Sequence, residues 1–122
     1  MAKHVLIADD SAISRTLVKQ ALQSSPELGE FWEAANGREA VELATESKPD
    51  LIILDLAMSE MNGLQAAKVL KRRMPDVPIV LFTFYDLGCW AQFANIDAVV
   101  SKPEGLQRLN ECVHTLLASV TR

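Results

Sequence analysis

Short runs of consecutive apolar residues recur along the chain, and the clearest of them is Leu51–Leu54, which ends in Asp55. An uninterrupted apolar run suits a strand covered on both faces, as in a parallel sheet that lies between helices. Pro49 and Asp50 before the run are typical of a break, and Met61–Gly63 after it are typical of a turn. We therefore expect a buried strand that delivers Asp55 to the edge of a sheet.

Four other segments also have the composition of strands. Two acidic residues follow the first of them, a threonine follows the third, and a lysine and a proline follow the last. In chain order these segments are Val5–Ala8, Phe31–Ala35, Pro78–Phe82 and Asp97–Ser101.

Between the strands, apolar residues repeat every three or four positions, which is typical of amphipathic helices. After Ser11, a good N-cap, the residues Ile13, Leu17, Ala21 and Leu22 fall on one face. The same periodicity predicts three further helices. They cover Ala40–Ala44, Leu64–Met74 and Leu106–Val120.

The segment from Phe84 to Ile96 is harder to interpret, because Gly88 interrupts it and aromatic residues crowd it. We predict a short or distorted helix there. Five strands then alternate with five helices, of which the fourth is irregular, and such alternation implies parallel β-α-β crossovers. The expected fold is an α/β domain with a doubly wound parallel sheet.

Composition supports a single domain over residues 1–122, because 49% of the residues are hydrophobic and one core is enough for this length. The formal net charge of −4 argues against direct binding of nucleic acid. The basic residues of 68–73 are more simply explained as the solvated face of a helix.

Cysteine usage and the chain's apolar runs bear on its location. Cys89 and Cys112 form no CxxC pair, so we expect both to be reduced. No apolar run reaches the roughly 18 residues that a membrane helix needs, and the first residues lack the apolar core of a signal peptide. We expect a cytoplasmic protein with no membrane partner.

Polar groups end the most apolar strands of the predicted sheet. Parallel strands bring their carboxyl ends to one edge of the sheet, where ligands bind in open α/β folds. Any one of these residues alone is better explained as a cap, a strand former or solvated surface, but their coincidence at four strand ends is not. The converging residues are Asp9, Asp10, Asp55, Thr83 and Lys102.

Three close carboxylates repel one another, and the pKa of at least one should rise unless a cation lies between them. A hard divalent cation such as Mg²⁺ or Mn²⁺ would relieve that repulsion. A carboxylate can also act as a nucleophile toward phosphorus and form an aspartyl phosphate. A lysine and a threonine hydroxyl beside it would hold the phosphoryl oxygens.

These motifs resemble the receiver domains of bacterial two-component response regulators, over essentially the whole chain. The resemblance implies a flavodoxin-like sheet with strand order 2-1-3-4-5. Together and in this order, the motifs are specific to that family. They are Asp9-Asp10-Ser11 with Arg15, the stretch from Asp55 to Gly63, Thr83, and Lys102-Pro103.

The resemblance also implies residue roles. Asp55 corresponds to the phosphate acceptor, and Asp10, Asp55 and the backbone carbonyl of Ala57 correspond to direct metal ligands. Asp9 corresponds to a ligand that acts through water. Thr83 and Lys102 correspond to the pair that holds the phosphoryl group, and the peptide bond between Lys102 and Pro103 resembles one that is commonly cis in the family.

Four features depart from the family pattern. Ser59 replaces a usual proline, and Val99 replaces the aromatic residue that rotates on phosphorylation. Phe84 stands where the family has a small residue, so we expect its ring to narrow access to Asp55, unless it packs inward near Trp90. The interval from Thr83 to Lys102 is also shorter by about one helical turn.

We weigh three functions for such a chain. A signalling switch that receives phosphate from a histidine kinase or phosphotransfer protein uses every motif, and it would act on a downstream protein or a fused output domain. A receiver-like interaction module that works without phosphorylation would not need the acidic cluster. A phosphatase with an aspartyl nucleophile is disfavoured, because it would want a second acid at position 57, where Ala57 stands.

Overall fold

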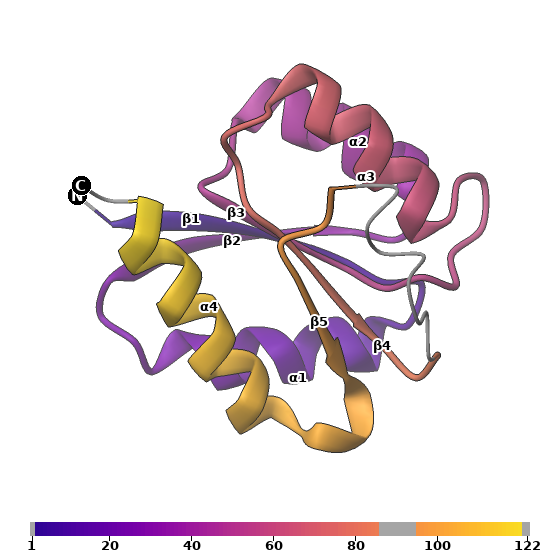
Figure 1. The fold of residues 1–122 in the computed structure, drawn as a ribbon. Helices are drawn as coiled ribbons and strands as arrows, with labels where there is room; N and C mark the ends of the chain where they lie inside the picture. The colour runs from indigo at the N-terminus through magenta and orange to yellow at the C-terminus, as the bar shows by residue number, and fades with distance from the viewer. Residues whose placement is uncertain (1, 86–94, 121–122) are drawn as a thin grey trace.

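The computed structural model describes residues 2–85 and 95–120. Strands and helices alternate along most of the chain, and each expected strand is present (Figure 1). In chain order the elements are β1 (Lys3–Ala8), α1 (Ala12–Gln23), β2 (Leu28–Ala34), α2 (Gly37–Ser47), β3 (Leu51–Leu54), α3 (Gly63–Arg73), β4 (Ile79–Thr83), β5 (Ala98–Ser101), the 3₁₀ turn η2 (Lys102–Glu104) and α4 (Leu106–Val120).

The five strands form one parallel sheet in the order β2-β1-β3-β4-β5, which confirms the order implied by the family resemblance. Residues at the strand ends are in register across the sheet. Ala8 of β1 pairs with Leu54 of β3, and Leu54 pairs with Leu81 of β4. The carboxyl ends of the three central strands therefore lie side by side.

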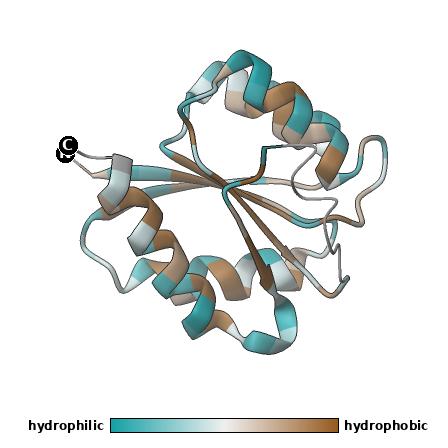
Figure 2. Ribbon diagram, in the orientation of Figure 1, coloured by the Kyte–Doolittle hydropathy of each residue, from teal (hydrophilic) through white to brown (hydrophobic). Residues whose placement is uncertain are grey.

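Among the described helices, α2 and α3 pack on one face of the sheet, and α1 and α4 pack on the other (Figure 1). Alternate residues of β1 point to opposite faces. Leu6 and Ala8 join the core beneath α2 and α3, whereas Val5 and Ile7 join the core beneath α1 and α4. Figure 2 shows the apolar sheet at the centre of the molecule and alternating apolar and polar positions along the helices.

Helix α1 buries a different face from the one that its apolar residues predicted. Val18 and Leu22 are buried, whereas Ile13 and Leu17 are 75% and 47% exposed. Leu22 belongs to both the expected and the observed face, so the error concerns the first two turns. Val18 and Leu22 belong to the core cluster that includes residues of β1 and α4, whereas Ile13 and Leu17 lie outside that cluster.

Strand β2 begins at Leu28, three residues before the expected start at Phe31. After buried Leu28, the exposed residues Gly29 and Glu30 carry little strand signal, because glycine and glutamate are poor strand formers. The backbone of β1 supplies the missing information: Lys3 pairs with Leu28 and His4 with Glu30, with a register shift between the two pairs.

The described residues contain four α-helices rather than the expected five. The expected irregular helix between Phe84 and Ile96 falls largely on residues 86–94, which lie outside the described part, as does Cys89. Cys112 is a buried free thiol in α4.

The peptide bond between Lys102 and Pro103 is trans, so the expected cis bond was wrong. Pro103 lies in the first turn of η2, where the fixed φ of proline suits the helical backbone and its missing N–H costs nothing. The turn therefore accommodates proline with the ordinary trans geometry.

Candidate functional site

The predicted site residues meet at the carboxyl ends of β1, β3, β4 and β5. Asp9 directly follows β1, Asp55 directly follows β3, and Thr83 ends β4. Thr83 pairs across the sheet with Ser101, the residue before Lys102. Local sequence forms each strand, and the parallel register then brings the four strand ends together.

The carboxylates of Asp9, Asp10 and Asp55 form a tight cluster in which one oxygen of each lies within 4.8 Å of the others. Asp9 and Asp55 are buried, whereas Asp10 is exposed. Backbone N–H groups orient the two buried carboxylates: Ser11 donates to Asp9 over 2.9 Å, and Leu56 donates to Asp55 over 2.8 Å.

The ammonium group of Lys102 lies between the two buried acids. Its Nζ atom is 2.8 Å from Asp9 Oδ2 and 3.3 Å from Asp55 Oδ2. Burial alone would raise the pKa of Asp9, but hydrogen bonds from Lys102, Ser11 and Ser14 outweigh it and lower that pKa. Lys102 is thus the cation that relieves the repulsion expected among the carboxylates.

The pKa of Lys102 shifts in the opposite direction to that of Asp9. Burial favours the neutral amine, yet the hydrogen bond to Asp9 and the charges of Asp55 and Asp9 outweigh burial and raise the pKa of Lys102. The lysine therefore carries its charge at neutral pH, as a group that binds phosphoryl oxygens must.

Thr83 is fully buried, and its Oγ1 accepts a hydrogen bond of 3.3 Å from the backbone N–H of Tyr85. Ala57 lies exposed in the loop between β3 and α3, two residues beyond Asp55. That loop returns closely to its start, because the backbone N–H of Gly63 donates to the carbonyl of Leu56 over 2.9 Å.

Two residues that depart from the family pattern lie at the surface. Phe84 is 73% exposed and Val99 is 41% exposed. The alternative in which Phe84 packs inward is therefore wrong. Instead, the centre of its ring lies 5.2 Å from Lys102 Nζ.

Sequence reasoning missed two contacts of this site. The centre of the ring of buried Phe82 lies 6.0 Å from Lys102 Nζ. The sequence pattern indicates only that Phe82 is a core residue of a strand. Arg15 donates from Nη1 to the backbone carbonyl of Asp9 over 2.6 Å and pairs with Glu33 over 3.0 Å. The motif drew attention to Arg15, but no local pattern indicates either partner.

The donor set fits Mg²⁺, a hard cation that prefers carboxylate, carbonyl and water oxygens. The cluster supplies carboxylate oxygens from three residues, and exposed Asp10 leaves one side open to water. A softer metal would prefer nitrogen or sulfur ligands, and this cluster contains neither.

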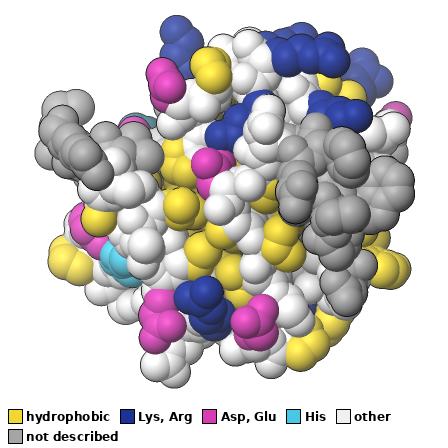
Figure 3. All heavy atoms as spheres, viewed as in Figure 1, with side chains coloured by type: hydrophobic (Ala, Val, Ile, Leu, Met, Phe, Trp, Pro, Cys, Tyr) yellow, Lys and Arg dark blue, Asp and Glu magenta, His cyan; other side chains and the backbone are white. Residues whose placement is uncertain are grey.

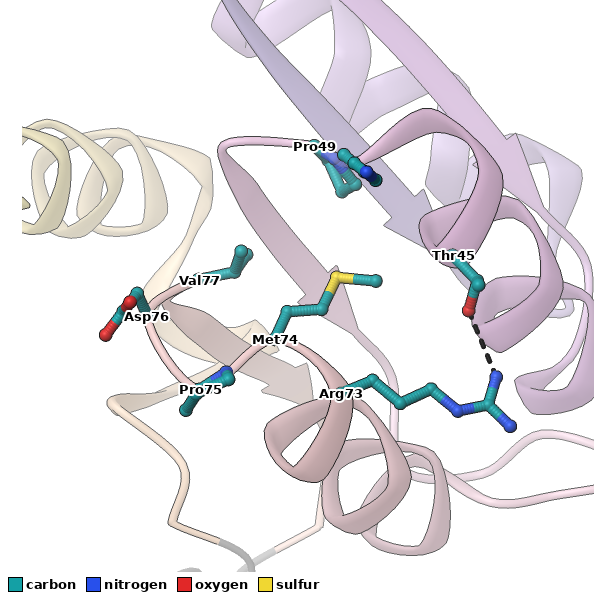
Figure 4. A pocket seen from close by; sticks show the side chains of 8 residues that line it. Thr45, Pro49, Arg73, Met74, Pro75, Asp76 and Val77 are labelled. Carbon is teal, nitrogen blue, oxygen red and sulfur yellow. Dashed lines mark hydrogen bonds between the residues drawn. The ribbon is translucent and has the colours of Figure 1, made fainter.

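A hollow of about 440 Å³ lies away from this cluster, at the opposite end of the sheet, beside the last turns of α2 and α3. In Figure 4, Arg73 reaches toward Thr45, whose Oγ1 accepts its hydrogen bond of 3.1 Å, and Asp76 points away from them. Figure 3 shows Lys and Arg side chains gathered over these helices. Cations at helix C-termini stabilise the helix dipole, so the basic residues there have a structural explanation.

The fold and the site together define a class of protein: a flavodoxin-like α/β domain with a carboxylate cluster, a threonine and a lysine at the carboxyl ends of its strands. The chain belongs to the response regulator receiver domain family, whose model matches residues 5–114. Receiver domains are the signalling switches of two-component systems, and they generally bind Mg²⁺ at such an acidic pocket.

Two curated relatives are larger proteins. The chain is 38% identical over 105 residues to the protein-glutamate methylesterase/protein-glutamine glutaminase 2 of Carboxydothermus hydrogenoformans, covering 83% of this chain and 30% of that protein. It is 42% identical over 79 residues to the corresponding protein of Pyrococcus horikoshii, covering 65% of this chain and 21% of that protein. The chain thus spans less than a third of either relative.

Solved structures show the same fold over nearly the whole chain. The response regulator domain of Thermotoga maritima CheB superposes with a TM-score of 0.85 at 26% identity, covering 100% of this chain and 98% of that one. The REC domain of AraT, a response regulator from Geobacillus stearothermophilus, superposes with a TM-score of 0.88 at 31% identity, covering 98% and 96%. Within the described residues, no helix is both long enough and apolar enough to span a membrane.

Proposed function

We propose that this chain is a single receiver domain over residues 1–122 that accepts a phosphoryl group on Asp55 and thereby changes its affinity for a partner. The observation that carries the proposal is the position of Lys102, 3.3 Å from Asp55 and 2.8 Å from Asp9, within a cluster of three carboxylates. Transfer of a phosphoryl group needs a nucleophile beside a cation that binds phosphoryl oxygens, and Asp55 beside Lys102 supplies both.

In the proposed reaction, a carboxylate oxygen of Asp55 attacks phosphorus as the bond to the donor's leaving atom breaks. The backbone N–H of Leu56 holds the other carboxylate oxygen, so the nucleophile is oriented before the donor arrives. Thr83 and Lys102 bind phosphoryl oxygens through a hydroxyl and an ammonium group. When bound, Mg²⁺ supplies positive charge to the phosphoryl oxygens.

Asp10, Asp55 and the backbone carbonyl of Ala57 would hold the ion directly, and Asp9 would hold it through water. This division agrees with the surroundings of the two adjacent acids, since Asp10 is exposed and Asp9 is buried against Lys102. Mn²⁺ has similar ligand preferences, and the same residues would bind it.

The phosphodonor in this proposal is a histidine kinase or a phosphotransfer protein in the cytoplasm. The exposed apolar side chains of Ile13 and Leu17 line a hollow of about 330 Å³ together with Phe84 and Lys102. Apolar surface beside the acceptor suits contact with a donor protein. The output would act on a downstream protein or a fused domain, such as the methylesterase named in the relatives, and not directly on nucleic acid.

Intact mass after incubation with acetyl phosphate and Mg²⁺ tests the assignment. We expect a gain of one phosphoryl group, which Asp55→Asn or removal of the ion with EDTA abolishes. Asp76→Asn is the matched control, because Asp76 is an exposed acid in the loop before β4, at the opposite end of the sheet. Equal labelling of Asp55→Asn would refute the acceptor.

The alternative, an interaction module that works without phosphorylation, is favoured by the altered output positions Phe84 and Val99, both of which are exposed. The same mass measurement separates the two functions. If the wild-type protein gains no phosphoryl group in the presence of metal, the interaction module is the better account.

A further inference from the structure

The exposed ring of Phe84 has a specific neighbour. Burying a phenylalanine ring is favourable, so a ring that is 73% exposed contributes little to the core. Its centre lies 5.2 Å from Lys102 Nζ, within the range of about 6 Å over which an ammonium group is attracted to a ring face. The ring is therefore close enough to attract the ammonium group of Lys102.

Lys102 is enclosed by two kinds of group. The carboxylates of Asp9 and Asp55 are within hydrogen-bond distance of its ammonium, and the rings of Phe82 and Phe84 lie 6.0 Å and 5.2 Å away. Phe82 is buried, whereas Phe84 is exposed, and only 11% of the lysine side chain reaches solvent. Phe84 is thus the ring of this pair that can change without opening the core.

We propose that Phe84 is a positioning residue for Lys102, in which the face of its ring holds the ammonium group beside Asp9 and Asp55. The second part of the proposal rests on the proposed function: the positioned ammonium speeds transfer of the phosphoryl group to Asp55. The ring itself touches no reacting atom. Its effect passes through Lys102, which needs a fixed place from which to bind phosphoryl oxygens.

A positioning role and simple shielding predict opposite changes in the phosphorylation rate when Phe84 is replaced. If the ring only obstructs the path to Asp55, a smaller side chain speeds phosphorylation by acetyl phosphate and a larger one slows it. If the ring positions Lys102, Phe84→Leu slows phosphorylation, because leucine keeps apolar bulk but has no ring face. Phe84→Trp then retains or increases the rate, because tryptophan is the best partner for a cation.

The experiment combines a structural and a kinetic readout. Nuclear magnetic resonance of the metal-free protein measures proton exchange of the Lys102 ammonium, identified by its loss in Lys102→Arg. We expect faster exchange in Phe84→Leu than in the wild type, and a rate of phosphorylation by acetyl phosphate with Mg²⁺ that falls roughly two- to fivefold. Phe84→Trp should match the wild type in exchange and equal or exceed it in rate.

Tyr85→Leu is the matched control, since Tyr85 is the next residue and its side chain is 57% exposed. It should leave ammonium exchange unchanged. Melting temperatures of all variants confirm that each is folded, which we expect because neither aromatic side chain is buried. Equal ammonium exchange in Phe84→Leu and the wild type overturns the proposal, and so does faster phosphorylation of Phe84→Leu with slower phosphorylation of Phe84→Trp.

The two proposals fail separately. If neither the wild type nor any variant accepts phosphate, the proposed function is wrong, but ammonium exchange still decides whether Phe84 positions Lys102. If the wild type accepts phosphate and Phe84→Leu behaves like it in both readouts, the phosphate switch stands and the positioning role is rejected.

Discussion

Asp9 and Asp10 are neighbours in the chain but have different surroundings. Asp9 is buried, receives a hydrogen bond from Ser11 and pairs with Lys102. Asp10 is exposed and belongs to the same carboxylate cluster. In the metal-free protein, Asp9 therefore makes attractive contacts, whereas the carboxylates around Asp10 repel it.

This difference predicts opposite effects of two alanine substitutions. Asp10→Ala should weaken Mg²⁺ binding without reducing the free energy of unfolding in EDTA, because it removes a repelled charge. Asp9→Ala should cost about 1–3 kcal/mol, because it leaves a buried ammonium group with one partner fewer. Thermal melts in EDTA and metal titrations measure both. A clear loss of stability in Asp10→Ala would mean that Asp10 is chiefly a structural cap.

The loop between β3 and α3 begins at Asp55, the proposed phosphate acceptor. Asn62 caps α3: its side chain accepts from the backbone N–H of Gln65, and the Gln65 side chain accepts from the backbone N–H of Asn62. Gly63 begins the helix so close to β3 that an added Cβ would lie 2.3 Å from the backbone carbonyl oxygen of Asp55. The start of α3 and the backbone of Asp55 thus constrain each other.

Gly63→Ala should therefore displace the backbone of Asp55, although Gly63 is not itself a site residue. The obstructing atom belongs to the backbone, so relief requires movement of the loop, and we expect a loss of about 1–3 kcal/mol of stability. Phosphorylation of Asp55 should also slow. Urea denaturation and intact-mass time courses measure the two effects.

Gly29→Ala serves as the control for Gly63→Ala, because its added Cβ would meet the side chain of Ala2 near the start of the chain. It should leave the phosphorylation rate unchanged. If Gly63→Ala phosphorylates at the wild-type rate, the close approach of α3 does not govern the acceptor.

At the scale of the whole molecule, a polar cluster ties α4 to the connection between α1 and β2. The Nε2 atom of His114 lies 2.8 Å from Ser25 Oγ, and its Nδ1 contacts the carboxylate of Glu27. His114 is far in sequence from Ser25 and Glu27, and Ser25 is buried. The cluster therefore joins the last helix to the first half of the fold.

We expect Ser25→Ala and His114→Ala each to lower the free energy of unfolding by about 0.5–1.5 kcal/mol. Because both remove the same hydrogen bond, the double variant should lose less than the sum, by at least about 0.5 kcal/mol. Urea denaturation provides the cycle. His114→Ala combined with Thr45→Ala, at the end of α2, should be additive, and additivity in the Ser25 pair would show that the hydrogen bond contributes nothing.

Sequence alone determined much of the molecule. Uniform apolar runs predicted the central strands, because a strand buried on both faces leaves no room for polar alternation. The polar residues at the ends of those strands predicted the position of the site, since parallel strands bring their carboxyl ends to one edge of the sheet. Asp9, Asp55, Thr83 and Lys102 accordingly lie where the pattern placed them.

Only the tertiary structure determined the features that depend on contacts between residues distant in the chain. The face of α1 that is buried depends on how the helix packs against β1, β2 and α4, so Ile13 and Leu17 are exposed despite their spacing. The start of β2 depends on pairing with β1. The place of Lys102 between Asp9 and Asp55, beside the ring of Phe84, depends on strand ends that meet only when the sheet has formed. The pattern of apolar residues indicates whether each residue is buried or exposed. These contacts instead join pairs of residues that lie far apart in the sequence and meet only in the folded chain.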